Sequence, residues 1–276
     1  MTTKLSDLSA PALAGVVKEK TVRAAIAEMR NAMYDGADMI DLHLSTLDDT
    51  GVVALKEIIS SLPLPTLALN YSNFSKETAE EQEPERVASL LRAAEAGAAG
   101  IDMQGYTFCQ PSKLAFVGEN KYSFTRDNPK EVVTDSAIIS KQCELIERVH
   151  SMGAEVLLSC HPGVYMNREQ VVELALFLEK RSPDIIKIVI AEANTEEQMA
   201  ECFATMVALK KEIKTPVTFH ANGKCGALTR IINPVLGGHI AFCVSRFNEE
   251  STMGQLDLRT AAAAVDSLFK ISKGGI

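Results

Sequence analysis

Short apolar runs of β type alternate with longer amphipathic runs along nearly the whole chain, and this rhythm limits the folds open to it. The stretches between the β-type runs carry apolar residues at three- and four-residue spacing, as in "VRAAIAEMRNAM" and "REQVVELALFLEKR", which is typical of helices that cover a sheet. Strict alternation of strand and helix predicts a parallel sheet. Eight runs are typical of strands; they begin at Leu13, Met39, Pro65, Gly100, Glu155, Ile185, Pro216 and His239.

Eight strand–helix units in 276 residues favour a closed (β/α)8 TIM barrel, with residues 1–276 in a single domain. The alternative is an open doubly wound sheet, which usually carries a glycine-rich turn after its first strand. The corresponding segment, "GVVKEKTVRAA", lacks that pattern. One long polar loop, around 105–135, interrupts the rhythm, and a loop of this length is usually either functional or disordered.

The charge and hydropathy of the chain argue against nucleic acid and membranes as partners. The net charge is −8 and no basic cluster is interleaved with aromatic residues, so we do not expect nucleic acid binding. No apolar run approaches the roughly 18 residues of a membrane span, and the N-terminus lacks a signal-peptide pattern. The six cysteines are scattered without a CxxC pair, which is typical of reduced thiols. We therefore expect a cytoplasmic protein that acts on a small molecule.

A lysine interrupts one of the most apolar strands, "DIIKIVI". Period-two alternation puts Ile185, Lys187 and Val189 on one face, and both faces of a barrel strand are covered. Burial of an amine is costly and needs a reason. A structural explanation is a lysine whose stem is buried while its amine reaches water or a carboxylate.

Further polar side chains collect toward the carboxyl ends of the predicted strands. In barrel enzymes this rim carries the active site, and convergence of several such residues predicts one here. The residues are Asp41, His43, His161, Thr218, His220 and Asn222.

A buried lysine next to a histidine predicts a particular chemistry. Burial favours the free amine of a lysine, which is a nucleophile toward ketones and aldehydes. The protonated imine acidifies the neighbouring carbon, and a histidine can take that proton and return it to a leaving hydroxyl. Lys187 and His161 thus indicate Schiff-base chemistry, either an elimination or an aldol cleavage.

Several segments resemble the type I 3-dehydroquinate dehydratases. "LLSCHPG" is similar to the family's strand with the catalytic histidine, and "PDIIKIVIAEANTEEQ" to its strand with the Schiff-base lysine. "GALTRIINPVLGGHIAFCVSRFNEESTMGQLDL" resembles the last two barrel units, and "SKETAEEQ" an acidic segment after the third strand. The resemblance implies a catalytic set of Lys187, His161 and Glu77, in which Glu77 orients the histidine. It also implies that Arg230 and Gln255 bind the substrate carboxylate, with Ser251 in a closing loop.

The same resemblance implies the reaction and the assembly. The family dehydrates 3-dehydroquinate to 3-dehydroshikimate on a (β/α)8 barrel, without metal or organic cofactor, and is often dimeric. The implied role is in the shikimate pathway and aromatic amino acid biosynthesis, or in breakdown of quinate-type compounds.

Two substrate-binding positions depart from the family pattern. The second strand normally carries Glu-Leu-Arg, and here reads Asp41-Leu42-His43. The third normally ends in an arginine, and here offers Asn70, Tyr71 and Asn73. Arginine and histidine are not equivalent anchors for a carboxylate. Asp41 and His43 are still expected to contact substrate, but both a divergent dehydratase and a homologue for a different hydroxy-ketone fit.

Three other functions stay open. A class I aldolase would use the same lysine, and "NGKCG" after the seventh strand could bind a phosphate. A metal-dependent hydrolase or isomerase could use hard ligands, although no HxH or HExxH pair is present. A barrel that only binds a ligand would leave Lys187 unreactive. The possible metal ligands are Asp41, His43, His161 and His220.

Overall fold

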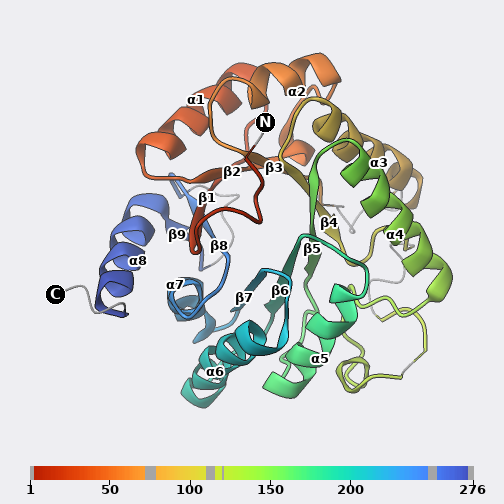
Figure 1. Ribbon diagram of the computed structural model, residues 1–276, viewed down its shortest axis with the longest axis vertical. Coiled ribbons are helices and arrows are strands. Elements are labelled where there is room, and N and C mark those ends of the chain that lie inside the picture. The colour runs from red at the N-terminus through yellow and green to blue at the C-terminus, as the bar shows by residue number, and fades with distance from the viewer. Residues whose placement is uncertain (1–2, 72–78, 110–115, 120, 248–253, 273–276) are drawn as a thin grey trace.

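The computed structural model describes residues 3–71, 79–109, 116–119, 121–247 and 254–272. Figure 1 shows a curled sheet at the centre of the molecule with helices around it. The strands are β1 (Ala12–Val17), β2 (Met39–His43), β3 (Thr66–Leu69), β4 (Gly100–Gln104), β5 (Glu155–Cys160), β6 (Ile185–Ile190), β7 (Val217–Ala221), β8 (Ile240–Val244) and β9 (Leu256–Asp257). The α-helices are α1 (Val22–Tyr34), α2 (Val52–Ile59), α3 (Ala79–Glu95), α4 (Ser136–Ser151), α5 (Arg168–Glu179), α6 (Glu196–Glu212), α7 (Thr229–Val235) and α8 (Leu258–Ser272).

All strand pairs are parallel, in the order β7-β6-β5-β4-β3-β2-β1-β8-β9. Between β7 and β8, the described residues form a seam instead of a ladder. His239 N donates to Val217 O at 2.9 Å, and Ile240 N donates to the Thr218 hydroxyl at 2.9 Å. The short β9 pairs with the carboxyl end of β8. The predicted (β/α)8 barrel is confirmed, with one loosely joined seam.

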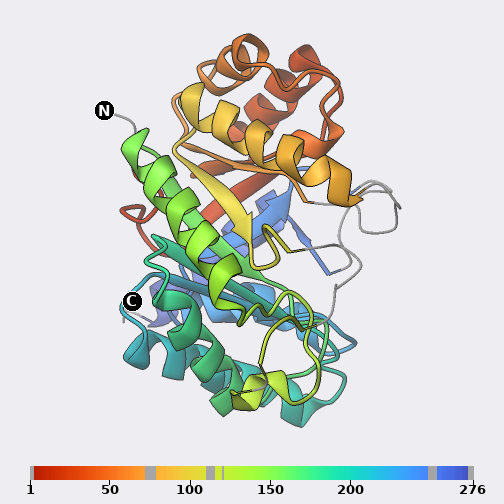
Figure 2. The ribbon, with the colours of Figure 1, turned by 90° about the vertical axis from the view of Figure 1, so that its right-hand side faces the viewer.

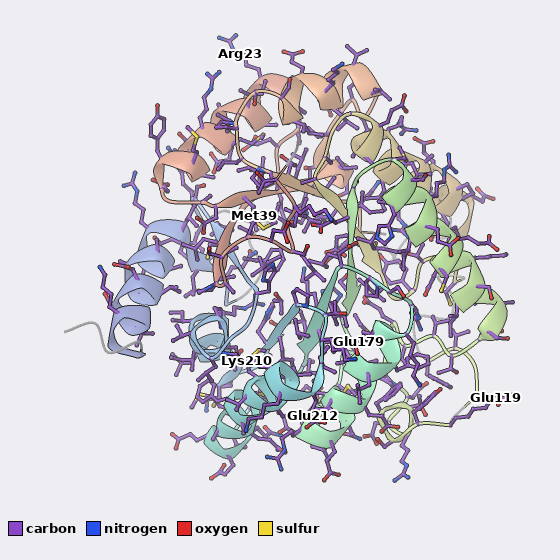
Figure 3. All side chains as sticks on the ribbon, in the orientation of Figure 1. Arg23, Met39, Glu119, Glu179, Lys210 and Glu212 are labelled. Atoms are coloured by element: carbon purple, nitrogen blue, oxygen red, sulfur yellow. The ribbon has the colours of Figure 1, made fainter. Side chains whose placement is uncertain are left out.

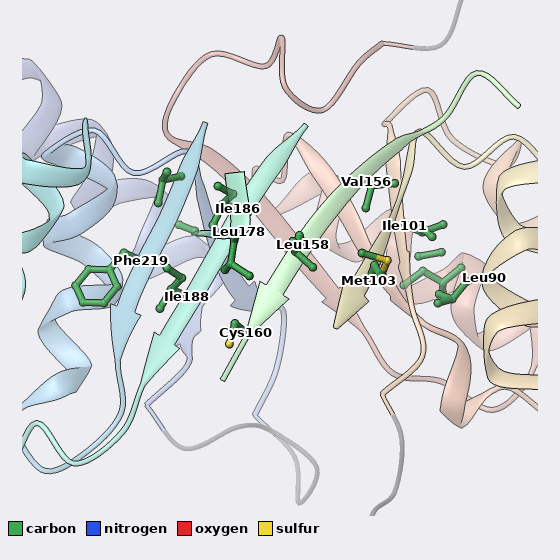
Figure 4. Packing of buried hydrophobic residues seen from close by; sticks show 14 of the residues in the cluster. Leu90, Ile101, Met103, Val156, Leu158, Cys160, Leu178, Ile186, Ile188 and Phe219 are labelled. Carbon is green, nitrogen blue, oxygen red and sulfur yellow. The ribbon is translucent and has the colours of Figure 1, made fainter. Parts of the chain in front are cut away.

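The strands separate two apolar layers, as the alternation along β6 predicts. Ile186, Ile188 and Ile190 pack in the layer between the sheet and the helices, part of which is shown in Figure 4. Ile185 belongs to the smaller cluster inside the barrel, together with Met39. Lys187, two residues beyond Ile185, therefore points inward.

The exposed charged side chains surround this double layer, whereas a smaller set of polar residues is buried inside the barrel. In Figure 3 the exposed charged residues Arg23 and Glu119 lie at the outline of the molecule, whereas Met39 lies near the centre. Figure 2, turned by 90°, shows helices on opposite sides of the sheet. No helix in the described part of the chain combines the length and apolar character that a membrane crossing requires.

The helices that follow β5 and β6 each begin with a capping box, which defines where the preceding loop at the rim ends. Asn167 and Gln170 form a reciprocal capping box at the start of α5, and Thr195 and Gln198 form another at the start of α6. Each box satisfies backbone donors that the first helical turn leaves open. The rim segments after β5 and β6 therefore have defined ends.

The long loop before α4 has structure of its own. A short 3-10 turn, η3 (Ser123–Thr125), brings Phe124 and Tyr122 against Phe177 of α5, at ring distances of 5.5 and 4.8 Å. A parallel bridge joins Val117 to Val133. This packing brings the last part of the loop to the carboxyl-terminal rim of the sheet.

Candidate active site

A cavity of about 150 Å³ opens at the carboxyl ends of the strands, where the sequence predicts the site. Of the predicted residues, Glu77 and Ser251 lie outside the described part of the chain, and Thr218 is bonded to the β8 backbone in the seam. The residues around the cavity are Asp41, His43, Leu69, Tyr71, His161, Lys187, Val189, His220, Asn222, Arg230, Phe242 and Gln255.

Lys187 is 7% exposed, and its amine lies inside the barrel. Its Nζ is 3.1 Å from the Tyr71 hydroxyl and 3.5 Å from Asp102 Oδ2. The amine also lies 4.1 Å from the centre of the Phe242 ring, a cation–π distance. The lysine therefore does not extend its amine to bulk water, as the structural explanation would allow, but does contact a carboxylate.

Asp102 is the fully buried carboxylate of this pair, and the sequence patterns do not single it out. Its Oδ1 accepts hydrogen bonds from the Ser159 hydroxyl at 2.6 Å and from Gln104 Nε2 at 3.3 Å, and Oδ2 accepts one from Tyr71 at 3.1 Å. A buried carboxylate needs such a set of donors. The same signal that marks Lys187, a charge within an apolar strand ("GIDMQ"), could have identified it.

His161 follows β5 and is held by Glu131 from the long loop. Glu131 Oε2 accepts from both the backbone N–H of His161, at 2.8 Å, and its ring Nδ1, at 2.9 Å. A neutral His161 in this arrangement carries its proton on Nδ1 and presents Nε2 to the cavity. The φ of Glu131 is +61°, which is uncommon for a residue other than glycine.

Glu131 thus makes the kind of contact with His161 that the family resemblance assigns to Glu77, which lies outside the described residues. The sequence predicts that the 105–135 loop is either functional or disordered, and Glu131 of this loop contacts His161. The particular glutamate could not be chosen from the sequence, because the loop has no periodicity to place its side chains.

Tyr71, the second residue after β3, lines the cavity. The hydroxyl lies 3.5 Å from His161 Nε2, and the two rings meet edge to face with centroids 5.4 Å apart. Burial, followed by the charges of Asp102, Asp41 and Glu131, raises the pKa of Tyr71 well above its ordinary value. The hydroxyl therefore keeps its proton at neutral pH.

Arg230, on α7, contributes a cation to the cavity lining. Its Nη1 lies 3.1 Å from His220 Nε2, and its Nη2 donates to Asn222 Oδ1 at 2.7 Å. Burial, then the positive charges of Arg230, Lys187 and His161, lowers the pKa of His220 well below its ordinary value, so this ring is neutral. Burial lowers the pKa of Arg230 to about 10, which leaves it charged at neutral pH. No carboxylate forms an ion pair with Arg230 among the described residues.

Asp41 and His43, from β2, complete the wall. His43 Nε2 lies 3.5 Å from Asp41 Oδ2. The other carboxylate oxygen, Asp41 Oδ1, is buried and has no hydrogen-bond partner within the described structure. A buried acceptor without a donor is unfavourable, and a substrate hydroxyl that donates to it would remove that cost.

Two of the alternative functions gain no support from the geometry. Within the described residues, no three histidines, cysteines or carboxylates lie close enough to hold a metal ion. Four of the five "NGKCG" amides already donate within the protein: Asn222 N to Ile190 O, Lys224 N to Asn194 Oδ1, Cys225 N to Ala193 O and Gly226 N to Gly223 O. These N–H groups are therefore not free to bind a phosphate.

Comparison with known proteins gives the family. Residues 131–272, slightly more than half of the chain and including the site's Glu131, His161, Lys187 and Arg230, match the Type I 3-dehydroquinase family. The chain belongs to this family. The match covers the part of the barrel from the end of the long loop to α8.

Two curated relatives of this type I 3-dehydroquinase family member are 3-dehydroquinate dehydratases. The one from Alkaliphilus oremlandii (strain OhILAs) is 26% identical over 127 residues, 46% of this chain and 49% of the relative. The one from Aromatoleum aromaticum (strain DSM 19018 / LMG 30748 / EbN1) is 26% identical over 106 residues, 38% of this chain and 40% of the relative. The chain thus spans about half the length, or less, of the curated relatives it matches.

Solved structures agree over nearly the whole chain. The 3-dehydroquinate dehydratase from Geobacillus kaustophilus HTA426 superimposes with a TM-score of 0.73 at 14% identity, covering 99% of this chain and 98% of that one. The type I enzyme from Clostridium difficile, solved with covalently modified comenic acid, gives 0.73 at 14% identity, covering 96% and 94%. At this identity the likeness shows the shared fold.

Proposed function

We propose that this member of the type I 3-dehydroquinase family dehydrates 3-dehydroquinate to 3-dehydroshikimate through an imine on Lys187. The observation that carries the proposal is the buried Lys187 amine, which faces a cavity that also contains the Nε2 of His161. The two 3-dehydroquinate dehydratases among the relatives support the substrate and the hydro-lyase activity.

The reaction begins with binding and imine formation. Arg230 and Gln255 hold the substrate carboxylate, and Asp41 Oδ1 accepts a hydrogen bond from a hydroxyl. The free amine of Lys187 attacks the ketone carbon, and the carbonyl oxygen leaves as water after protonation. The product of this stage is an iminium ion, which withdraws electrons from the adjacent carbon.

Elimination then uses His161. Its Nε2 removes a proton from the carbon next to the iminium, and the electron pair moves into the iminium to give an enamine. The enamine expels the hydroxyl one carbon further on, which takes the proton from His161 and leaves as water. Glu131, 2.9 Å from Nδ1, stabilises the imidazolium between the two transfers. Hydrolysis of the conjugated iminium releases the product and Lys187.

The same chemistry on a different hydroxy-ketone acid is the second candidate. It is favoured by the residues on β2 and after β3, where Asp41, His43 and Tyr71 line the cavity in place of the family's acid and arginines. Arg230 then provides the main attraction for a carboxylate.

We extend the proposal to the assembly and the location of the protein. The family resemblance supports a homodimer, which sedimentation of the purified protein would test. The six free cysteines support a cytoplasmic location.

The proposal is tested by trapping the imine. The protein is mixed with 3-dehydroquinate and sodium borohydride, which reduces the imine to a stable amine, and is then analysed by peptide mass spectrometry. We expect an adduct on Lys187 in the wild type and no adduct in Lys187→Ala. Without borohydride, we expect ultraviolet absorbance to rise as the conjugated product forms, and the rate to fall by several orders of magnitude in Lys187→Ala.

Lys211→Ala, which removes an exposed lysine at the end of α6, is the matched control and should form the adduct at the wild-type rate. An adduct without a rise in absorbance would favour the second candidate substrate. Wild-type protein that forms no adduct with any hydroxy-ketone acid would contradict the imine mechanism itself.

A further inference from the structure

The Tyr71 hydroxyl occupies a junction between the two groups assigned to catalysis. It lies 3.1 Å from Lys187 Nζ, 3.5 Å from His161 Nε2 and 3.1 Å from Asp102 Oδ2. A hydroxyl can accept one hydrogen bond while it donates another. The single hydroxyl proton can be directed at Asp102 Oδ2 or at His161 Nε2, and in the second orientation this oxygen atom connects the nucleophile with the acid/base residue.

We propose that Tyr71 is a catalytic proton carrier between Lys187 and His161 during imine formation. This inference rests on the imine chemistry proposed above and adds a third participating side chain to it. It follows from the position of one oxygen atom between two nitrogen atoms, and not from the family pattern, which has an arginine near the end of this strand.

The proton carrier removes the extra proton of Lys187 before the amine attacks the ketone. An ammonium group has no lone pair, so the ammonium form of Lys187 must lose one proton before the free amine can attack a ketone. Tyr71 accepts that proton from Nζ on its oxygen and passes its own hydroxyl proton to His161 Nε2. The tyrosine ends as it began, the lysine becomes a neutral amine, and the histidine becomes an imidazolium beside Glu131. The imidazolium then protonates the oxygen that leaves the carbinolamine as water, so the proton balance closes.

The surroundings of Tyr71 suit a carrier that never holds a lasting charge. Burial and nearby carboxylates disfavour the phenolate, as the raised pKa of Tyr71 indicates. The edge-to-face contact with the His161 ring keeps the hydroxyl near Nε2. The charged and titratable groups that face Tyr71 are Asp41 and His43 from β2, Asp102 from β4, Glu131 from the long loop, His161 after β5 and Lys187 from β6.

Hydrogen bonds from α3 hold the residue that precedes Tyr71. Arg86 of α3 donates to the backbone carbonyl of the preceding residue, Asn70, at 2.9 Å, and the Asn70 side chain donates to Ser89 at 2.9 Å. The start of the segment that carries the ring is therefore held against α3. A proton carrier must stay close to Lys187 Nζ and to His161 Nε2 at the same time. The hydrogen bonds between α3 and Asn70 favour that geometry.

Tyr71→Phe tests the proposal, because it removes only the hydroxyl. The probes are 3-dehydroquinate and, separately, hydroxyacetone, a small ketone that needs no carboxylate site. The measurement is the initial rate of borohydride-trapped adduct on Lys187, followed by mass spectrometry between pH 6 and 10. At neutral pH we expect the variant to be slower by about 100-fold, the lower range for acid–base assistance.

The pH dependence separates a carrier from a packing residue. As pH rises, water and hydroxide deprotonate the amine directly, so the difference between wild type and Tyr71→Phe should shrink. A defect in packing would give a difference that does not depend on pH in this way. Tyr165→Phe removes a hydroxyl that donates to Glu201 at 2.7 Å, outside the cavity lining, and should trap at the wild-type rate.

The possible results are distinct. Equal trapping rates for wild type and Tyr71→Phe at all pH values would overturn the proposal and indicate that Asp102 takes the proton from Lys187 directly. A slower variant with a constant deficit would also overturn it. If wild type traps hydroxyacetone but not 3-dehydroquinate, the substrate assignment fails while the carrier is still tested. If wild type traps neither ketone, the imine chemistry and the carrier fail together.

Discussion

At the scale of single residues, the Glu131–His161 contact controls which nitrogen of the imidazole faces the cavity. Glu131→Gln keeps the length of the side chain and an oxygen acceptor but removes the negative charge. In the proposed mechanism, the imidazolium of His161 then loses its counter-ion, the Glu131 carboxylate 2.9 Å from Nδ1. We expect kcat for dehydration to fall by about 10- to 100-fold with little change in KM, because such stabilisation acts on the charged intermediate stage.

Glu119→Gln is the control for this substitution, since Glu119 lies in the same loop but is exposed and pairs with Lys121. It should leave kcat unchanged. If Glu131→Gln raises KM and leaves kcat as it was, Glu131 serves substrate binding and not the charge on His161.

At the scale of elements, α3 holds the rim of the sheet together through one buried side chain. Arg86 is 5% exposed and donates to Asn70 O, Gln104 Oε1 of β4 and the Thr107 hydroxyl, while Glu83 pairs with it from the same helix. Arg86→Met would leave these groups, including a largely buried carboxylate, without their donor. We expect the free energy of unfolding to fall by about 3–5 kcal/mol, the range for breaking a buried pair, as measured by urea denaturation.

Arg92→Met offers a comparison on the same helix. Arg92 bonds to Thr50 and Glu85, and its side chain is 27% exposed. A pair of this kind contributes up to about 1 kcal/mol. Equal losses for the two variants would show that the buried network does not tie β3, β4 and the loop together.

At the scale of the whole molecule, the buried neutral His220 makes stability depend on pH. Burial, Arg230, Lys187 and His161 lower its pKa in the folded state, so below about pH 6.5 the unfolded chain binds a proton that the folded chain does not. The stabilisation is complete above pH 6.5 and decreases as the pH falls toward the folded pKa. One such group changes the free energy of unfolding by at most about 1.4 kcal/mol per pH unit.

The measurement is the free energy of unfolding at pH 7.5, 6.5 and 5.5 for wild type and His220→Asn. We expect the wild type to lose stability more steeply below pH 6.5, because the variant lacks this titration. The difference between the two slopes is the readout, since the substitution also changes the contact with Arg230. Parallel curves would mean that His220 binds its proton equally well in the folded protein.

The sequence by itself determined the barrel and the direction in which the Lys187 side chain points. The predicted strands begin within one residue of the observed ones, because runs of branched apolar residues and capped helices are local patterns. Ile185 and Ile186 point to opposite sides of β6 for the same reason, and the period of two fixes Lys187 on the inner face. His161 and Arg230 were found through motifs that keep their order along the chain.

Only the tertiary structure decided the partners of these residues. Tyr71 and Asp102 are 116 and 85 positions from Lys187, and they meet it because the curled sheet brings β3, β4 and β6 around one cavity. Glu131 reaches His161 from a loop whose left-handed backbone at that residue has no sequence signal. A strand's period is set by its own backbone, but contacts across the barrel depend on how the sheet curves and how each loop folds, which no short stretch of sequence specifies.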